Sequence, residues 1–202
     1  MQEIKQFRCR ASAISQIMTN SRTKGQLSKT AQTYCETWLK EQIYGRRKEI
    51  YNKYLQKGLD MENEAIELVE LHYGYDFLIK NEQNFANDFI TGTPDLILPD
   101  CIRDTKCSWD CFTFPLFESE LDKTYYWQMQ GYMALTERKT AFVDYVLVDT
   151  PQELDLSAQT YADIDMDKRI KSFEVKFDAK EYESIQARVI ECREYIKSLL
   201  DG

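Results

Sequence analysis

The chain of 202 residues lacks several features that mark common protein classes. It has one histidine, His72, so catalysis by a histidine base is not expected. No CxxC pair or Cys/His set with zinc spacing occurs in it. No apolar stretch approaches the roughly 18 residues of a membrane span, and the start of the chain lacks the apolar run of a signal peptide. We therefore expect an intracellular protein.

The composition is that of a globular protein. With 43% hydrophobic and 30% charged residues, 7 Gly, 4 Pro and no repeat, the chain is expected to fold as one domain with a sizeable core. In an intracellular protein its cysteines are expected to be reduced thiols. The six are Cys9, Cys35, Cys101, Cys107, Cys111 and Cys192.

Charge is distributed unevenly along the chain. The net charge is −8, yet residues 1–60 hold 12 Lys or Arg against 5 Asp or Glu, while residues 61–202 hold 14 against 29. This asymmetry permits a basic surface for nucleic acid on one side of the molecule, and it equally permits a solvated helix face. Charge alone does not identify the partner.

Periodicity predicts an α/β fold with a mixed sheet. Helices are expected over 11–19 with Ser12 as the cap, over 28–45 ending at Gly45, after Arg47, from about 60 to 74, and over 124–137. Strands are expected at about 76–80, 84–90, 93–98, 101–107, 140–150 and 172–178. A last helix carries an apolar stripe of Tyr182, Ile185, Val189, Cys192, Ile196 and Leu199.

Residues 91–106, TGTPDLILPDCIRDTK, are expected to form two short strands joined by a turn at Pro99–Asp100. The turn would pair Leu98 with Cys101, Ile97 with Ile102 and Leu96 with Arg103. Asp95 would then face Asp104, with Cβ atoms about 5 Å apart. Proline is unsuited to the primed turns that such hairpins prefer, so a slip of one residue, which would separate the two carboxylates, stays open.

Two facing carboxylates tend to hold a proton or a cation between them. Side chains alternate along a strand, so Lys106 shares the face of Asp104. Oxygen ligands of this kind suit Mg²⁺ or Mn²⁺ rather than zinc. The [DE]xK pattern by itself is weak, because composition predicts roughly three by chance and the chain has five, beginning at Glu3, Asp104, Glu137, Glu174 and Asp178. Only Asp104 closely follows a Pro-Asp strand, while Glu174 and Lys176 fit a solvent-facing pair.

Four segments in order resemble the motifs of the PD-(D/E)xK nucleases, and more narrowly the phage lambda exonuclease and YqaJ-like alkaline exonuclease group. They are GLDME (58–62), GTPDLIL (92–98), RDTK (103–106) and QMQGY (128–132). The resemblance covers about residues 8–150, and CRASAISQIMT resembles the N-terminal serine-bearing helix of the group. Asp104 stands where the group more often has Glu.

The resemblance implies a restriction-endonuclease-like fold, with a central mixed sheet flanked by helices, in a single nuclease domain over 1–202. Within it, 1–75 would be mainly helical and basic, 76–150 the catalytic sheet and helix, and 151–202 a strand plus the C-terminal helix. Asp95, Asp104, the Thr105 carbonyl and Glu62 would ligate one or two Mg²⁺, or Mn²⁺. Lys106 and Gln128 would act on the attacking water, and Ser12, Arg10 and Tyr132 would lie at the DNA phosphate.

Several of these assignments have alternatives. Glu64 competes with Glu62, and Gln130 competes with Gln128. Asp95 after Pro94 fits turn chemistry as well, and Lys106 fits a strand-edge charge. The aromatic run Tyr125, Tyr126 and Trp127 is more typical of core than of a base-stacking surface. The iron–sulfur nucleases of the RecB branch need further cysteines near the end, and only Cys192 lies there, so no iron–sulfur cluster is expected.

The function implied is a metal-dependent exonuclease of phage or prophage type, in the cytoplasm of a bacterial host. It would degrade one strand of linear duplex DNA from 5′ to 3′ and leave a 3′ overhang for a single-strand annealing partner. The group often forms ring-shaped homotrimers, whose channel the basic N-terminal third would line. Alternatives are a RecB/Cas4-like repair or CRISPR-adaptation nuclease, and a non-catalytic DNA-end-binding module of the same fold.

Overall fold

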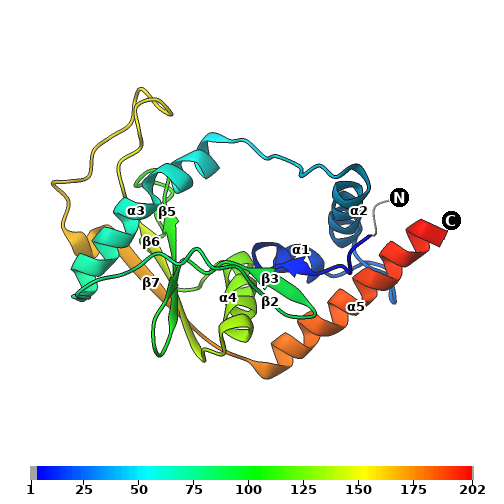
Figure 1. Ribbon diagram of the computed structural model, residues 1–202. Coiled ribbons are helices and arrows are strands. Elements are labelled where there is room, and N and C mark those ends of the chain that lie inside the picture. The colour runs from blue at the N-terminus through cyan, green and yellow to red at the C-terminus, as the bar shows by residue number, and fades with distance from the viewer. Residues whose placement is uncertain (1–3, 202) are drawn as a thin grey trace.

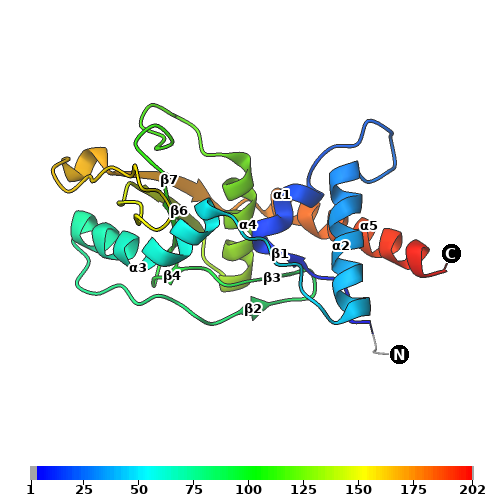
Figure 2. The same ribbon diagram turned by 90° about the horizontal axis from the view of Figure 1, so that it is seen from above.

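The computed structural model describes residues 4–201. Its helices are α1 (Ile14–Ile17, preceded by a 3-10 turn at Ala11–Ala13), α2 (Lys29–Tyr44), α3 (Lys53–Tyr73), α4 (Lys123–Thr136) and α5 (Ala179–Asp201). Its strands are β1 (Cys9–Arg10), β2 (Phe85–Ala86), β3 (Ile90–Gly92), β4 (Leu96–Ile97), β5 (Ile102–Cys107), β6 (Thr140–Val146) and β7 (Ile170–Lys176). Figures 1 and 2 show the sheet carrying β5, β6 and β7 at one end of the molecule and α2 with α5 at the other.

The strands form two sheets, both mixed, which confirms the predicted α/β class. The larger has the order β4-β5-β6-β7, with β5 and β6 parallel and the outer pairs antiparallel. The smaller has the order β1-β3-β2. The single strand expected over 84–90 is wrong, because Asn87 turns the chain within it. The Asn87 side-chain oxygen accepts hydrogen bonds from the backbone N–H groups of Phe89 and Ile90, and pairing resumes in β3.

Helix α4 lies between the larger sheet and helices α1 and α5 (Figure 1). It contacts α1, β3, β6 and α5. Its buried residues occupy nearly every side of the helix; they are Gln128, Met129, Gln130, Gly131, Tyr132, Met133 and Thr136. A helix surrounded in this way has little free surface along its second half, so the polar members among them need internal partners.

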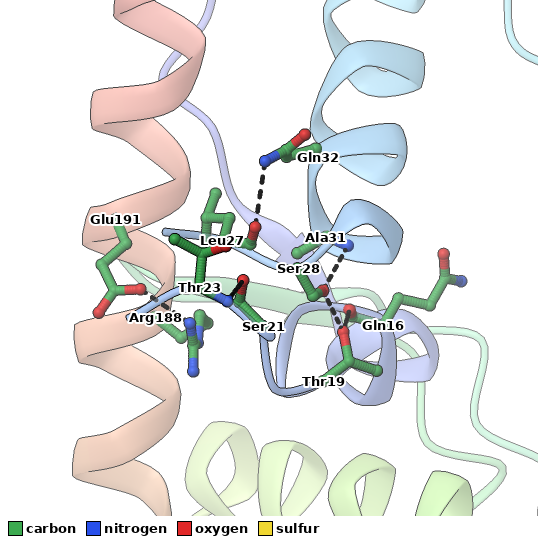
Figure 3. Close-up of polar contacts among 10 residues, drawn as sticks. All are labelled: Gln16, Thr19, Ser21, Thr23, Leu27, Ser28, Ala31, Gln32, Arg188 and Glu191. Carbon is green, nitrogen blue, oxygen red and sulfur yellow. Dashed lines mark hydrogen bonds and ion pairs between the residues drawn. The ribbon is translucent and has the colours of Figure 1, made fainter. Parts of the chain in front are cut away.

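The ends of α2 follow local chemistry, as expected. Ser28 caps the helix by accepting a hydrogen bond from the Ala31 N–H at 3.1 Å, and Thr19 contacts the Ser28 hydroxyl (Figure 3). Gly45 ends the helix in the left-handed conformation that glycine adopts without strain. The expected cap at Ser12 is wrong: Ser12 lies inside the 3-10 turn, whose N-cap position is Arg10 and has no side-chain cap bond.

The two helices expected after Arg47 and near residue 60 are one helix, α3. Residues 46–52 form no helix, and they cross from α2 to α3 over the centre of the molecule (Figure 1). The Asn52 side-chain oxygen accepts a hydrogen bond from the Leu55 N–H at 2.8 Å and so caps α3. Sequence reasoning missed Asn52 as the residue that sets the start of this helix.

The predicted apolar stripe of α5 is confirmed for its central residues. Ile185, Val189, Cys192 and Ile196 are buried against the main core, whereas Leu199 is 42% exposed. The six cysteines are free thiols, of which Cys111 is exposed and Cys107 partly so. Among residues 4–201, no helix combines the length and apolar character needed to cross a membrane.

Gly92 ends β3 where three elements approach closely. A Cβ at this position would lie 2.6 Å from Cε1 of Tyr132 and 2.9 Å from Cβ of Ala11. The Tyr132 ring is buried and has no room to move.

We therefore expect Gly92→Ala to lower the free energy of unfolding by about 2 kcal/mol, measured by chemical denaturation. Gly58→Ala is the matched control, because a Cβ at Gly58 meets nothing within 4 Å, and alanine is favoured over glycine by about 0.5–1 kcal/mol inside a helix. Equal effects of the two changes would contradict the close packing at Gly92.

Candidate active site

The hairpin of β4 and β5 has the register predicted from the sequence. Leu96 pairs with Arg103 and Ile97 with Ile102, and the Leu98 N–H donates to the Cys101 carbonyl at 2.9 Å. Pro99 and Asp100 are therefore the two turn residues, and the one-residue slip does not occur. This register places Asp95, just before β4, beside Asp104 and Thr105 of β5.

Asp95, Asp104 and Lys106 form a cluster at this edge of the sheet. The Asp95 carboxylate accepts hydrogen bonds from the Thr105 N–H at 2.9 Å and from its hydroxyl at 3.3 Å. Lys106 Nζ forms an ion pair with Oδ2 of Asp104. The Asp104 side chain is 1% exposed and that of Lys106 22% exposed. The cluster thus holds one buried carboxylate, Asp104, together with a carboxylate and an ammonium that are partly exposed.

The electrostatics of the cluster favour a positive charge. Burial, and after it the charge of the nearby Asp104, raise the pKa of Asp95 to about 7, against the lowering effects of Lys106 and of the Thr105 hydrogen bonds. Burial alone would lower the pKa of Lys106, but the charges of Asp104 and Asp95 outweigh it and raise that pKa above its ordinary value. Lys106 is therefore an ammonium at neutral pH, and one positive charge faces two carboxyl groups.

Helix α3 contributes Glu62 to the same region. Its carboxylate forms an ion pair with Lys80 Nζ at 2.7 Å, and Lys80 pairs with Leu96, next to Asp95, through an isolated β-bridge. Glu64 is exposed and does not line the cavity at the cluster. Of the two alternatives, Glu62 is the one that lines the cavity at the cluster, and its carboxylate is paired with the Lys80 ammonium.

Helix α4 contributes Gln128. Its amide nitrogen donates to the Tyr132 hydroxyl at 3.0 Å and lies 3.5 Å from Oδ1 of Asp104. Gln130 lies elsewhere. Its side chain donates to the Lys176 carbonyl at 2.8 Å and accepts from the Asp178 N–H at 2.9 Å, so it ties α4 to the segment between β7 and α5. Tyr132 is 6% exposed and lies behind Gln128.

A cavity of about 650 Å³ opens over the cluster. The predicted site residues that line it are Ser12, Glu62, Asp95, Thr105, Lys106 and Gln128. Arg10 and Tyr132 instead line an adjoining pocket, which shares Ser12 with the cavity and also contains Arg47. The Arg10 guanidinium is paired with Glu41 at 2.6 Å, whereas Arg47 forms no ion pair with any residue in 4–201.

The donor set fits a hard divalent cation. Oδ2 of Asp104 is buried and has no hydrogen-bond partner among residues 4–201. Its ion-pair partner within those residues is Lys106. Carboxylate and carbonyl oxygens are the ligands that Mg²⁺ and Mn²⁺ prefer. Within residues 4–201 no group of three or more His, Cys, Asp or Glu side chains converges. Two carboxylates, Asp95 and Asp104, are therefore the side chains that could hold such a cation, and Glu62 would join them on leaving Lys80.

Sequence reasoning missed Lys57, one position before Gly58. Its ammonium, fully buried, donates to the carbonyls of Ser108, Trp109 and Val148 and contacts the Thr150 hydroxyl, at 2.7 to 2.9 Å. Burial lowers the pKa of Lys57 to about 8, and four oxygen neighbours favour the charged form. Lys57 thereby fixes α3 to the chain segments that follow β5 and β6. A single lysine in a helix gives no signal of this role.

The aromatic run before Gln128 divides as follows. Tyr126 and Trp127 pack against the main core and do not line the cavity. Tyr125 lines the cavity, with its ring centroid 5.0 Å from Lys106 Nζ. Among the other [DE]xK fragments, Glu174 and Lys176 form the expected exposed ion pair, and Glu3 lies outside the described residues.

The carboxyl groups at the cluster oppose folding where no cation is bound. The pKa of Asp95 is about 7 in the folded chain against 3.8 for an unperturbed aspartate, so the folded state loses stability as pH rises from about 4 to about 7. We expect Asp95→Asn to raise the free energy of unfolding at pH 8 in EDTA by about 1–2 kcal/mol, less than the full shift because the site opens to water. The gain should vanish near pH 4.

Asp100→Asn, the same change at an exposed turn position, is the control for this measurement. Thermal unfolding of both variants across pH 4 to 8 compares them directly. A loss of stability in Asp95→Asn at pH 8 would contradict the repulsion between the two carboxylates.

Comparison with solved structures identifies relatives of the whole chain. A phage-related exonuclease from Haemophilus somnus 129PT is 31% identical, with a TM-score of 0.88 over 98% of this chain and 96% of the relative. An alkaline exonuclease from Laribacter hongkongensis has a TM-score of 0.74 at 15% identity, over 96% of this chain and 90% of that one. The same enzyme in complex with dAMP has a TM-score of 0.71 at 19% identity and the same coverage. No protein-family model and no curated protein sequence matches the chain.

Proposed function

The chain belongs to the phage-related exonucleases of the PD-(D/E)xK group, and from this premise we propose that it is a divalent-metal-dependent exonuclease acting on linear duplex DNA. The observation that carries the proposal is the cavity in which Asp95, Thr105, Lys106, Gln128 and Glu62 meet. These residues come from β5, α3, α4 and the position just before β4, so only the folded chain assembles them.

The residues that would hold the metal are Asp95, Asp104 and the Thr105 carbonyl, with Glu62 reaching it directly or through water. Mg²⁺, or Mn²⁺, would supply a water of lowered pKa and neutralise the charge that builds up on the scissile phosphate. Glu62 must first leave Lys80, and an exposed ion pair of this kind costs little to break.

Lys106 acts as a cation and hydrogen-bond donor in this proposal. Its raised pKa keeps it protonated and so unavailable as a base, and it therefore holds the attacking water and stabilises the oxygens of the phosphate. Gln128 orients Asp104 through the 3.5 Å contact, and Tyr132 fixes the Gln128 amide. Ser12 and Arg10, with Arg47 added by the structure, hold phosphate in the pocket that adjoins the cavity.

The family relation supports finer expectations. Degradation runs from 5′ to 3′ and leaves a 3′ overhang for a single-strand annealing protein. The active form is a homotrimer whose channel is lined by the basic N-terminal third. The enzyme works in the bacterial cytoplasm without an iron–sulfur cluster.

The proposal is tested with linear and covalently closed duplex DNA, each in Mg²⁺ and in EDTA. We expect loss of linear DNA only, only in Mg²⁺, and faster from an end with a 5′-phosphate. Lys106→Ala should reduce the rate by about 10²-fold or more, because it removes the cation at the reacting phosphate. Lys176→Ala, in the exposed fragment of the same spacing, is the control and should keep full activity.

The other outcomes are equally specific. Cleavage of closed circles would indicate an endonuclease. Binding of DNA ends with no cleavage in any metal would indicate a non-catalytic DNA-end-binding module. Equal rates for ends with and without 5′-phosphate would contradict the phosphate pocket.

A second test separates Glu62 from Glu64. Glu62→Gln should raise the Mg²⁺ concentration required for half-maximal activity by about 10- to 100-fold, because a ligand or its supporting water is lost. Glu64→Gln, outside the cavity, should leave that concentration unchanged. An effect of Glu64→Gln alone would reverse the assignment.

A further inference from the structure

We infer that Tyr54 and Trp109 form a nucleobase-binding corner beside the catalytic cavity, where the base next to the scissile phosphate is stacked. The inference rests on the proposed function, because it concerns the DNA strand that enters that cavity. Tyr54 lies in the first turn of α3, and Trp109 lies two residues after β5. Both line the same cavity as Asp95, Lys106 and Gln128.

The two rings are in contact. Their centroids lie 5.0 Å apart with an angle of 70° between the planes, so they meet as an edge against a face. Tyr54 is 59% exposed, and Trp109 is partly exposed. A pair of aromatic rings open to solvent beside buried carboxylates is unusual for a core contact, and it presents a flat apolar surface to whatever enters the cavity.

The corner is held rigidly at its base. Lys57 donates to the carbonyls of Ser108 and Trp109, which fixes the backbone that carries the indole. The same ammonium donates to Val148, so the loop cannot shift without breaking buried bonds. A rigid aromatic surface loses little entropy on binding, which favours stacking of a flat ligand.

The charges around the corner suit a nucleic-acid strand. Lys53 Nζ lies 4.6 Å from the centroid of the Trp109 ring and 5.5 Å from that of Tyr54. Lys53 is exposed, and a cation above an exposed ring is held more weakly than a stacked base. On binding, the ammonium moves to a phosphate and leaves the indole face to the base.

The positions of the corner and of the phosphate pocket indicate where a DNA strand would run. Trp109 and Tyr54 line the cavity but not the pocket of Arg10 and Arg47, whereas Ser12 lines both. Asp95 and Lys106 of the cluster line the same cavity as the corner. A strand with one phosphate at the arginines therefore has a base at the aromatic corner and a phosphodiester at the cluster. Stacking on an aromatic face is tolerant of sequence, as an exonuclease requires.

The inference is tested by binding in EDTA, where no cleavage is expected. The ligands are a short fluorescent 5′-phosphorylated duplex and three versions with an abasic nucleotide at the first, second or third position of the phosphorylated strand. The wild type should bind one abasic version about tenfold more weakly than the intact duplex. Trp109→Ala should bind the intact duplex and that abasic version with the same reduced affinity. Trp109→Phe should keep most of the difference in affinity between the two.

The controls separate stacking from structure. Phe117→Ala removes another exposed aromatic from the same loop, outside the cavity, and should keep the wild-type pattern. If Trp109→Ala lowers the unfolding temperature, Tyr54→Ala, at a solvent-exposed ring, tests the same corner and should also reduce the abasic difference.

Three results would overturn the inference while leaving the exonuclease proposal intact. The first is an enzyme that cuts DNA but binds the intact and the abasic duplexes with equal affinity. The second is a difference in affinity between these duplexes that persists in both Trp109→Ala and Tyr54→Ala. The third is a change of oligomeric state in these variants while that difference in affinity stays unchanged. A wild type that neither binds nor cuts DNA ends would instead remove the proposed function itself, and the inference with it.

Discussion

The burial of two neighbouring carboxyl groups at the open end of a hairpin is the constraint on which the site depends. Asp95 and Asp104 are brought together by strand pairing, and burial raises the pKa of Asp95 to about 7. Within residues 4–201, Lys106 is the ammonium that forms an ion pair with Asp104. A pair of carboxylates that folding brings together at a cost in stability binds a cation more strongly than two carboxylates free in solution, because the cost is relieved on binding.

The rest of the fold keeps this cluster in place and accessible. Helix α4 is buried on nearly every side, so Gln128 stands behind Asp104 with a fixed orientation. Helix α3 is tied to the segments after β5 and β6 by Lys57, and it carries Glu62 to the cavity one turn later. Gly58, between them, lines the cavity and has open space where a side chain would stand. The site is thus rigid behind the carboxylates and open in front.

The sequence was most informative where local rules decide the geometry. The register of β4 and β5 follows from the turn at Pro99–Asp100, and the ends of α2 follow from Ser28 and Gly45. The single helix α3 was not predicted, because its start depends on one capping residue, Asn52. The ion pair of Glu62 with Lys80, the four oxygen contacts of Lys57 and the contact of Tyr54 with Trp109 join residues far apart in the chain. No local pattern predicts such contacts, because tertiary packing alone brings these residues together.

We propose that the cluster of Asp95, Asp104 and Lys106 is a divalent-cation site. Thermal unfolding without DNA at pH 8, in EDTA and in Mn²⁺ or Mg²⁺, tests this for the wild type and Asp104→Asn. Metal should raise the unfolding temperature of the wild type in a concentration-dependent way and leave that of Asp104→Asn nearly unchanged. An unfolding temperature of the wild type that does not respond to either metal, or an equal response in both proteins, would contradict it.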